Sequence, residues 1–402
     1  MKNSFLDYVC IFTGGSIRGG AYVGALRAME ELGLNNKCFV GSSVGSILAS
    51  LYAIGYNPDE LEEIFNDINF DLFKDINFSF SKEFYISKGE NFLEWLRDNI
   101  GKKYYGNKYV KNESPPVTFK DFKKDIAILT TDLYKTEVKV FSKQTTPDFE
   151  VAKAVRISSS MPGLLKPTEY ASCLLVDGDL SRSWPIWKIV PALMDYDARI
   201  LEFRLEGSKE RRNIENTADY LNSVYTTFSN FAADHVISTY KDRDKFDYIR
   251  LDAGAVNITD FNLSLDGKKE LYKMGYNTTL NYFKNDLLKK KINILPHYKQ
   301  IYAELNEIKN YLIKSKYILA KNKLAELFVY ISKCRKVIDA NYFEKILDFY
   351  EKFMNNLFVT MGIVSLVRDK DGLTSELQNI IENIENKLKE LEEFINVNSI
   401  NR

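Results

Sequence analysis

Hydrophobic residues near the start of the chain alternate between short apolar runs and helical spacing. Residues 8–12 form an apolar run that ends in glycines, and residues 21–32 then show helical spacing. The order repeats with an apolar run at 38–40, a glycine-flanked turn and a helix-like run at 44–54. These patterns predict two consecutive strand–turn–helix units.

The same alternation continues through the middle of the chain. Asn57-Pro58-Asp59-Glu60 has the residues of a helix start: an N-cap, a proline at N1 and a glutamate at N3. Further strands are expected at 126–130, 138–141, 174–176 and 248–251, with helical patterns at 91–100 and 150–158. Strands that alternate with helices predict an α/β fold, a three-layer α/β/α sandwich with a mostly parallel central sheet.

The pattern changes beyond about Leu280, where glycine becomes scarce, lysine and glutamate increase, and helical periodicity continues to the end. We therefore expect a catalytic domain over residues 1–288 and an all-helical C-terminal region over residues 289–402. Six residues, called here the heptad stripe, have the a/d spacing of a coiled coil: Leu377, Ile381, Ile384, Leu388, Leu391 and Ile395. They predict either a helix that pairs two chains in a homo-oligomer or an amphipathic helix that packs on its own domain.

Composition narrows the range of partners. The chain has 402 residues with 55 basic and 55 acidic side chains, so no net field attracts nucleic acid, and we expect no nucleic-acid partner. The four cysteines are widely spread without a CxxC spacing, which predicts buried free thiols. The N-terminus lacks the layout of a signal peptide, and the apolar stretch at 357–367 is too short to span a membrane. We expect a cytoplasmic protein.

The spacing of possible ligand residues does not indicate a metal site or a cofactor site. No group of histidine, cysteine, aspartate and glutamate has the spacing of metal ligands, and Asp177-x-Asp179 is too sparse for a calcium loop. The sequence therefore predicts no metal and no cofactor.

One turn has the pattern of an activated serine. Gly41-Ser42-Ser43-Val44-Gly45 fits G-x-S-x-G, in which the flanking glycines let a strand turn sharply into a helix and expose the serine. Ser43 would lie at a helix N-terminus, where the helix dipole favours developing negative charge.

A second glycine-rich turn precedes it. Gly14-Gly15-Ser16-Ile17-Arg18-Gly19 offers successive backbone amides at a strand-to-helix turn, as a tetrahedral oxyanion requires. A structural glycine turn and a nucleotide phosphate loop are the alternatives, but the G-x-x-x-x-G-K-[ST] pattern of the latter is absent.

An activated serine also requires a base. The chain has two histidines, His235 and His297, and His235 follows Asp177 in the order Ser, Asp, His that α/β-hydrolases use. His235 lies in a stretch of helical character, whereas Asp177-Gly178-Asp179 directly follows the strand at 174–176. A direct dyad of Ser43 and Asp177 is the simpler assignment, and the triad remains the alternative.

The ordered set of motifs resembles the patatin-like phospholipase family of bacterial type. That family has a G-G-[GS]-x-[RK]-G turn, then G-x-S-x-G, then a late D-G-x after a short strand. Residues 41–65, 128–141 (ILTTDLYKTEVKVF) and 151–167 are also similar to family segments, so the resemblance covers roughly residues 7–285. Two positions depart from the pattern: Ser16 replaces a glycine, and Ser183 replaces an asparagine that usually follows the D-G pair.

The resemblance implies a lipid acyl hydrolase with phospholipid or another acyl lipid as substrate and with peripheral contact to membranes. Ser43 would attack the ester, Asp177 would accept its proton, and an acyl-enzyme would form. The implied oxyanion and anion-binding turn comprises Gly14, Gly15, Ser16, Arg18 and Gly19, the nucleophile elbow Gly41 and Gly45, and the aspartate motif Gly178 and Asp179.

Three questions remain open at this point. The substrates could instead be soluble esters or thioesters, because catalytic residues do not encode headgroup or chain length. The helical region could make the protein an effector whose lipase body is restrained until a partner binds. Seven aromatic residues between Phe65 and Tyr85 either line an acyl pocket or complete the core.

Overall fold

In a computed structural model, the protein folds into two compact units. The structure describes residues 7–68, 85, 87–181, 199–207, 214, 217–240, 244–254, 256, 263–335, 337–360 and 363–400. The first unit comprises Met1–Ser238 and Phe246–Asn281, and the second comprises Thr239–Lys245 and Tyr282–Arg402. The Ser183 position and residues 69–84 of the predicted aromatic segment lie outside the described residues.

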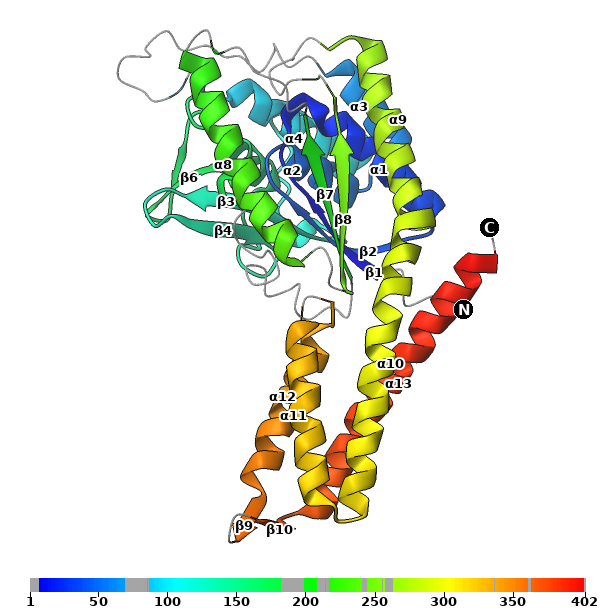
Figure 1. Ribbon diagram of the computed structural model, residues 1–402. Coiled ribbons are helices and arrows are strands. Elements are labelled where there is room, and N and C mark those ends of the chain that lie inside the picture. Colours follow the sequence, from blue (N-terminus) through cyan, green and yellow to red (C-terminus); the bar gives the residue numbers. More distant parts are fainter. Residues whose placement is uncertain are drawn as a thin grey trace. The chain divides into compact units, whose positions relative to one another are not determined.

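A mixed sheet forms the centre of the first unit (Figure 1). Among the described residues its order is β5-β6-β3-β2-β1-β7-β8, with β4 paired to the other side of β3. Neighbours from β3 to β8 in this order run parallel, while β4 and β6 are antiparallel to β3. The strands are β1 (Asp7–Phe12), β2 (Asn35–Gly41), β3 (Asp125–Asp132), β4 (Glu137–Ser142), β5 (Thr168–Tyr170), β6 (Cys173–Asp177), β7 (Arg199–Glu206) and β8 (Phe246–Asp252).

Helices cover both faces of this sheet. The helical segments are η2 (Ser16–Gly19), α1 (Gly20–Glu31), α2 (Val44–Ile54), α3 (Pro58–Asp67), α4 (Glu90–Tyr105), η4 (Gly106–Lys108), η5 (Phe119–Asp121), α5 (Val151–Ser158), η6 (Gly178–Ser181), α8 (Thr217–Tyr240) and α9 (Leu265–Asn281). On one face, Tyr22 of α1 packs edge-on against Phe12. Arg204 of β7 bonds to Asp234 of α8 on the other. The predicted α/β/α architecture is confirmed.

Local sequence signals explain several helix and strand boundaries. Asn57 caps α3 and forms a capping box with Glu60, as the sequence predicts. The central strand β1 is apolar on both faces because both are covered, and Tyr8 to Phe12 are at most 1% exposed. Strand β7 was not predicted, although it pairs with β1 and β8 in the middle of the sheet.

Helices α1 and α9 pack against each other through glycines. A Cβ added at Gly24 would lie 2.0 Å from the carbonyl oxygen of Tyr272, and one at Gly275 would lie 1.8 Å from that of Ala21. The two backbones therefore approach more closely than any larger residue allows at these positions.

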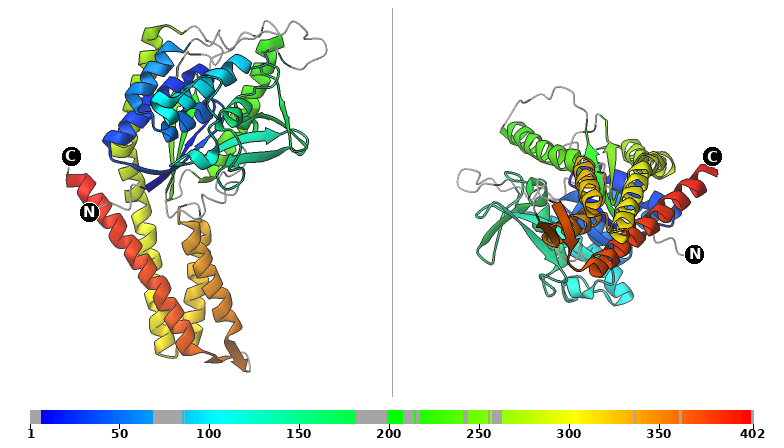
Figure 2. Two further views of the ribbon diagram at one scale, coloured as in Figure 1. Left: turned by 180° about the vertical axis from the view of Figure 1, so that it is seen from behind. Right: turned by 60° about the horizontal axis from the view of Figure 1, so that its bottom comes forward.

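The second unit is built mainly from four helices, which lie side by side (Figure 2). They are α10 (Leu287–Ile313), α11 (Tyr317–Lys333), α12 (Ala340–Asn355) and α13 (Lys370–Ile400), preceded by the π-helical turn η7 (Tyr282–Asp286). The expected all-helical region also contains an antiparallel hairpin of β9 (Leu357–Thr360) and β10 (Ile363–Val367). Most of the apolar stretch at 357–367, which is too short to span a membrane, lies in these two strands.

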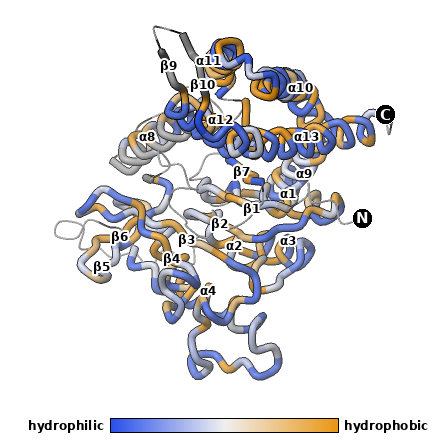
Figure 3. The backbone as a smooth tube through the Cα atoms, turned by 90° about the horizontal axis from the view of Figure 1, so that it is seen from below, coloured by the Kyte–Doolittle hydropathy of each residue, from blue (hydrophilic) through white to orange (hydrophobic). Residues whose placement is uncertain are grey.

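The heptad stripe of α13 is used inside the second unit. Hydrophobic and hydrophilic residues alternate along α10 and α13 (Figure 3). Leu377, Ile381, Ile384, Leu388 and Leu391 are each at most 8% exposed and belong to one core cluster with residues of α10, α11 and α12. This burial favours an amphipathic helix that packs on its own unit over a coiled coil between chains.

A buried carboxylate anchors the short segment that precedes β8 to the helices of the second unit. Asp244 is fully buried and forms ion pairs with Lys291 of α10 at 2.5 Å and with Lys387 of α13 at 2.6 Å. Both lysines are also buried, so the three charges depend on one another.

Two further observations concern the whole chain. All four cysteines are free and buried, as predicted. Within the described ranges, no helix combines the length and the apolar character that crossing a membrane requires.

Candidate active site

The Ser43 turn joins the end of β2 to the start of α2. Ser43 is half-buried and has φ 50° and ψ −128°, a conformation that costs a non-glycine residue about 1–3 kcal/mol. A Cβ added at Gly41 would lie 2.4 Å from Cα of Ser46, and one at Gly45 would lie 2.0 Å from the carbonyl oxygen of Phe12. Both flanking glycines are therefore required for the sharp turn that the sequence predicts.

Hydrogen bonds to α5 hold the backbone of this turn. The amide of Ser43 donates to Oγ of Ser158 at 3.0 Å, and that hydroxyl donates in turn to the carbonyl oxygen of Leu129 at 2.6 Å. Ser158 was not among the predicted site residues. It belongs to the SSSMPG segment, whose resemblance to the family was the available signal.

Asp177 ends strand β6 and is 1% exposed. Its amide donates to the carbonyl oxygen of Ser160 at 3.0 Å, and its carbonyl accepts from Oγ1 of Thr131 at 2.8 Å. Its Oδ1 accepts the amide of Asp179 at 2.9 Å. The backbone and one carboxylate oxygen of Asp177 are thus fixed by neighbours on β3, on the turn after α5 and on its own turn.

Asp179 connects three turns that are far apart in the sequence. Its Oδ1 accepts the amide of Gly14 at 2.8 Å and also the hydroxyl of Ser42. A Cβ added at Gly14 would lie 2.0 Å from Oδ2 of Asp179 and 2.9 Å from Cβ of Ser43. The glycine-rich turn, the Ser43 turn and the aspartate turn therefore meet at one place.

The glycine-rich turn has a left-handed residue where the sequence departs from the family pattern. Ser16 has φ 55°, so a side chain is present where the backbone favours glycine. A Cβ at Gly15 would lie 2.6 Å from Leu205 of β7, and one at Gly19 would lie 2.4 Å from Val44. The amide of Gly14 is already donated to Asp179, whereas the amides of Gly15 and Ser16 have no acceptor among the described residues.

Comparison with known proteins decides the family. The model of patatin-like phospholipases matches residues 11–188, the range that contains all three turns. The uncharacterized protein R571 of Acanthamoeba polyphaga mimivirus is 32% identical over 274 residues, which are 65% of this chain and 89% of that protein. The chain belongs to the patatin-like phospholipase family.

Other proteins are similar to large parts of the chain. The uncharacterized protein YqhO of Bacillus subtilis is 25% identical over 297 residues, 68% of this chain and 97% of that protein. A probable lipid hydrolase, 463L of Invertebrate iridescent virus 6, is 28% identical over 184 residues, 44% of this chain and 61% of that protein. The crystal structure of VipD from Legionella pneumophila has a TM-score of 0.50 and 15% identity, covering 97% of this chain and 88% of that one. This last likeness shows the fold alone.

In this patatin-like unit the Arg18 side chain has structural contacts. It is 5% exposed, and its Nε donates to the carbonyl oxygen of Val256 at 2.7 Å. Its Nη2 occupies the space beside Gly207, where an added Cβ would lie 2.2 Å from it. These contacts hold the glycine-rich turn to the ends of β7 and β8, and anion binding by Arg18 stays a prediction.

The two histidines have different surroundings. His235 is exposed on α8, whereas Asp177 is buried at the end of β6. His297 belongs to α10 in the second unit, where its Nδ1 lies 2.8 Å from the hydroxyl oxygen of Tyr330. Phe65 and Tyr85, at the two ends of the predicted aromatic segment, are both buried.

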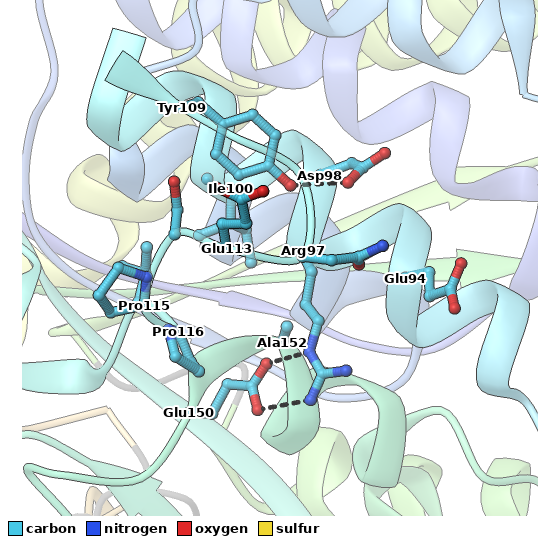
Figure 4. Close-up of a pocket in the computed structure, with 14 residues that line it drawn as sticks. Glu94, Arg97, Asp98, Ile100, Tyr109, Glu113, Pro115, Pro116, Glu150 and Ala152 are labelled. Carbon is cyan, nitrogen blue, oxygen red and sulfur yellow. Dashed lines mark hydrogen bonds and ion pairs between the residues drawn. The ribbon is translucent and has the colours of Figure 1, made fainter.

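A cavity of about 320 Å³ lies elsewhere in the patatin-like unit, between α4, residues 109–117 and the start of α5 (Figure 4). Arg97 binds Glu150 there through two hydrogen bonds of 2.5 and 3.0 Å, and the hydroxyl of Tyr109 donates to Asp98. None of its lining residues is a predicted site residue. Among the described residues, no group of three acidic, cysteine or histidine side chains is placed to hold a metal ion.

Proposed function

We propose that this protein is a lipid acyl hydrolase that cleaves carboxylic ester bonds of membrane lipids, with Ser43 as nucleophile and Asp177 as its base. Family membership supports hydrolysis of lipids as the reaction class. The assignment of the two residues is our own.

The meeting of three turns at Asp179 is the observation that carries the proposal. Asp179 accepts hydrogen bonds from Gly14 and Ser42 and donates its own amide to Asp177. A nucleophile, a carboxylate base and a row of backbone amides are the components that acyl transfer needs close together. The exposure of His235 on α8 supports a dyad over a triad.

The proposed reaction has two steps. Asp177 accepts the hydroxyl proton of Ser43 while Oγ attacks the ester carbonyl, and the leaving alcohol then takes that proton from Asp177. Water next attacks the acyl-serine, with Asp177 again accepting a proton, and the fatty acid leaves as Ser43 regains its hydrogen. The amides of Gly15 and Ser16, together with the N-terminus of α2, would stabilise the oxyanion.

Release of free fatty acid from mixed phospholipid vesicles tests the proposal. We expect Ser43→Ala and Asp177→Asn to lose roughly 10³-fold or more of the activity, because each removes a group that acts on the reacting atoms. His235→Ala and Ser238→Ala, two exposed positions on α8, should retain it.

Folding of each variant is checked by far-ultraviolet circular dichroism. Equal loss in His235→Ala would replace the dyad with a triad. Activity that persists in Ser43→Ala would remove the proposed nucleophile altogether.

A further inference from the structure

Helix α8 exposes a continuous apolar face. Four of its residues are largely exposed: Tyr220 (58%), Val224 (39%), Phe228 (70%) and Phe231 (77%). Their spacing of four, four and three residues places them along one side of the helix. Contiguous exposed side chains of this size are typical of interaction surfaces. We call these four residues the α8 apolar face.

A neighbouring side of α8, about 110° around the helix axis from the α8 apolar face, contacts the sheet. Arg204 of β7 is 1% exposed and donates to Oδ1 of Asp234 at 2.9 Å and to Oδ1 of Asn230 at 3.1 Å. Ile237, on the same side, is 9% exposed. These contacts fix the rotation of the helix, and the exposed fractions of the four residues place the α8 apolar face on its solvent side.

The helix also reaches beyond the edge of the sheet that carries the candidate active site. Strands β7 and β8 are parallel, so α8 runs back between them from the carboxyl edge, the edge at which the Ser43 turn follows β2. Asp234 lies beside Arg204 near the end of β7, and the helix begins at Thr217. The 17 residues from Thr217 to Ala233 span roughly 25 Å. Figure 1 shows α8 extending past the arrowheads of β7 and β8.

The amino-acid composition of the first part of α8, residues 217–233, indicates which kind of lipid surface it can contact. Residues 217–233 contain a single charged side chain, Asp219, and no lysine or arginine. Tyrosine and phenylalanine suit the boundary between lipid headgroups and acyl chains. Attraction to an anionic membrane would need basic residues, which this segment lacks.

We propose that the α8 apolar face docks on a neutral, zwitterionic lipid surface and brings the active-site edge of the sheet toward the lipid. The proposal rests on the proposed function, since an enzyme that cleaves membrane lipids must meet them at such a surface. It adds the element that makes this contact.

Binding to phosphatidylcholine vesicles is measured by flotation, in a Ser43→Ala background so that no lipid is consumed. Phe228→Ser/Phe231→Ser should weaken binding at least about tenfold, because two large apolar groups no longer leave water. Phe228→Leu/Phe231→Leu keeps the apolar character and should bind within about threefold of the parent. Tyr104→Ser removes an exposed aromatic residue (42%) near the end of α4, beside the Lys103 that lies over Tyr56 after α2 and so at the opposite edge of the sheet, and should have no effect.

Three results would overturn the proposal. The serine double variant could bind as tightly as the parent, or binding could require phosphatidylserine and disappear at high salt. A change of the solution mass from dimer to monomer with unchanged vesicle binding would assign the face to a second copy of the chain.

Hydrolysis is scored separately on vesicles and on a water-soluble ester. The ratio of the two rates should fall at least about tenfold in the serine double variant made with Ser43 intact. If the wild type hydrolyses neither substrate but still binds vesicles, the catalytic proposal fails while the docking proposal stands.

Discussion

Asp179 is buried, and its carboxylate accepts two hydrogen bonds from neighbouring turns. Its carboxylate is 3% exposed and binds the amide of Gly14 and the hydroxyl of Ser42. Hydrogen bonds to an ionised acceptor are stronger than neutral ones, and in a buried place they are costly to lose. Asp179 therefore holds the Ser43 turn and the glycine-rich turn in register with each other.

Replacement by asparagine tests this role while keeping the shape of the side chain. We expect Asp179→Asn to lower the free energy of unfolding by about 1–3 kcal/mol, measured by urea denaturation, because both donors lose a charged acceptor. Hydrolysis should fall at least about tenfold in kcat. Asp148→Asn, at an exposed ion pair with Lys120, is the matched control and should leave both quantities unchanged. An Asp179→Asn protein as stable as the control would contradict the role.

For individual residues of the candidate site, the sequence predicts those features that a short, continuous pattern encodes. The glycines around Ser43 and the turn after the strand at 174–176 are short patterns, and the structure brings these turns together. The bond between Asp179 and Gly14 joins residues 165 positions apart, so no local pattern contains it. The positive φ of Ser16 has an indirect signal in the sequence: the family pattern has glycine at this position, and glycine favours a left-handed backbone.

Helices α1 and α9 have a strict requirement for side-chain size where they meet. Gly275 is buried, and an added Cβ would overlap the carbonyl oxygen of Ala21 at 1.8 Å. Backbone atoms of a packed helix cannot move away as a flexible side chain can. The two helices must therefore separate if either glycine gains a side chain.

Alanine substitutions at two glycines separate this effect from helix propensity. Gly275→Ala should lower the free energy of unfolding by roughly 1–3 kcal/mol through overpacking. Gly20→Ala, also in this helix pair, meets no atom closer than 3.8 Å and should be neutral or stabilising by up to about 1 kcal/mol. Thermal and urea unfolding measure both changes. Equal effects of the two substitutions would show that the close approach does not matter.

Strand β7 shows why one central element was not predicted. Leu201, Phe203 and Leu205 are buried, but Glu202 and Arg204 between them are charged. An alternating pattern of this kind usually indicates a strand with one side in solvent. Here the charges are buried as well, and Nη1 and Nη2 of Arg204 donate to Asp234 and Asn230 of α8. The alternation was a usable signal for a strand, whereas its central position depended on these distant partners.

For the whole molecule, the division into units does not follow the order of the chain. Thr239–Lys245 belongs to the second unit, although the residues before and after it belong to the first. A change of composition along the sequence cannot reveal such an insertion. The predicted limits of 1–288 and 289–402 for two functional domains stay a prediction.

Asp244 is the residue through which this inserted segment can be tested. Asp244→Asn removes the carboxylate that buried Lys291 and Lys387 share, while Lys387 keeps Glu390 at 2.8 Å, and it should cost about 3 kcal/mol of stability. Urea unfolding followed by far-ultraviolet circular dichroism measures the loss. Asp348→Asn removes a largely exposed partner of Lys352 and serves as the control. A loss below about 1 kcal/mol would show that the two buried lysines do not depend on Asp244.

The same anchor sets an order of events during protein synthesis. Lys291 follows Asp244 by 47 residues, and Lys387 follows it by 143 (387 − 244). At roughly 5–20 residues per second, the ribosome completes Lys387 about 7–29 seconds after Asp244. Asp244 therefore leaves the ribosome long before the second of its two lysine partners exists. The buried carboxylate of the inserted segment Thr239–Lys245 gains both partners only when translation nears its end.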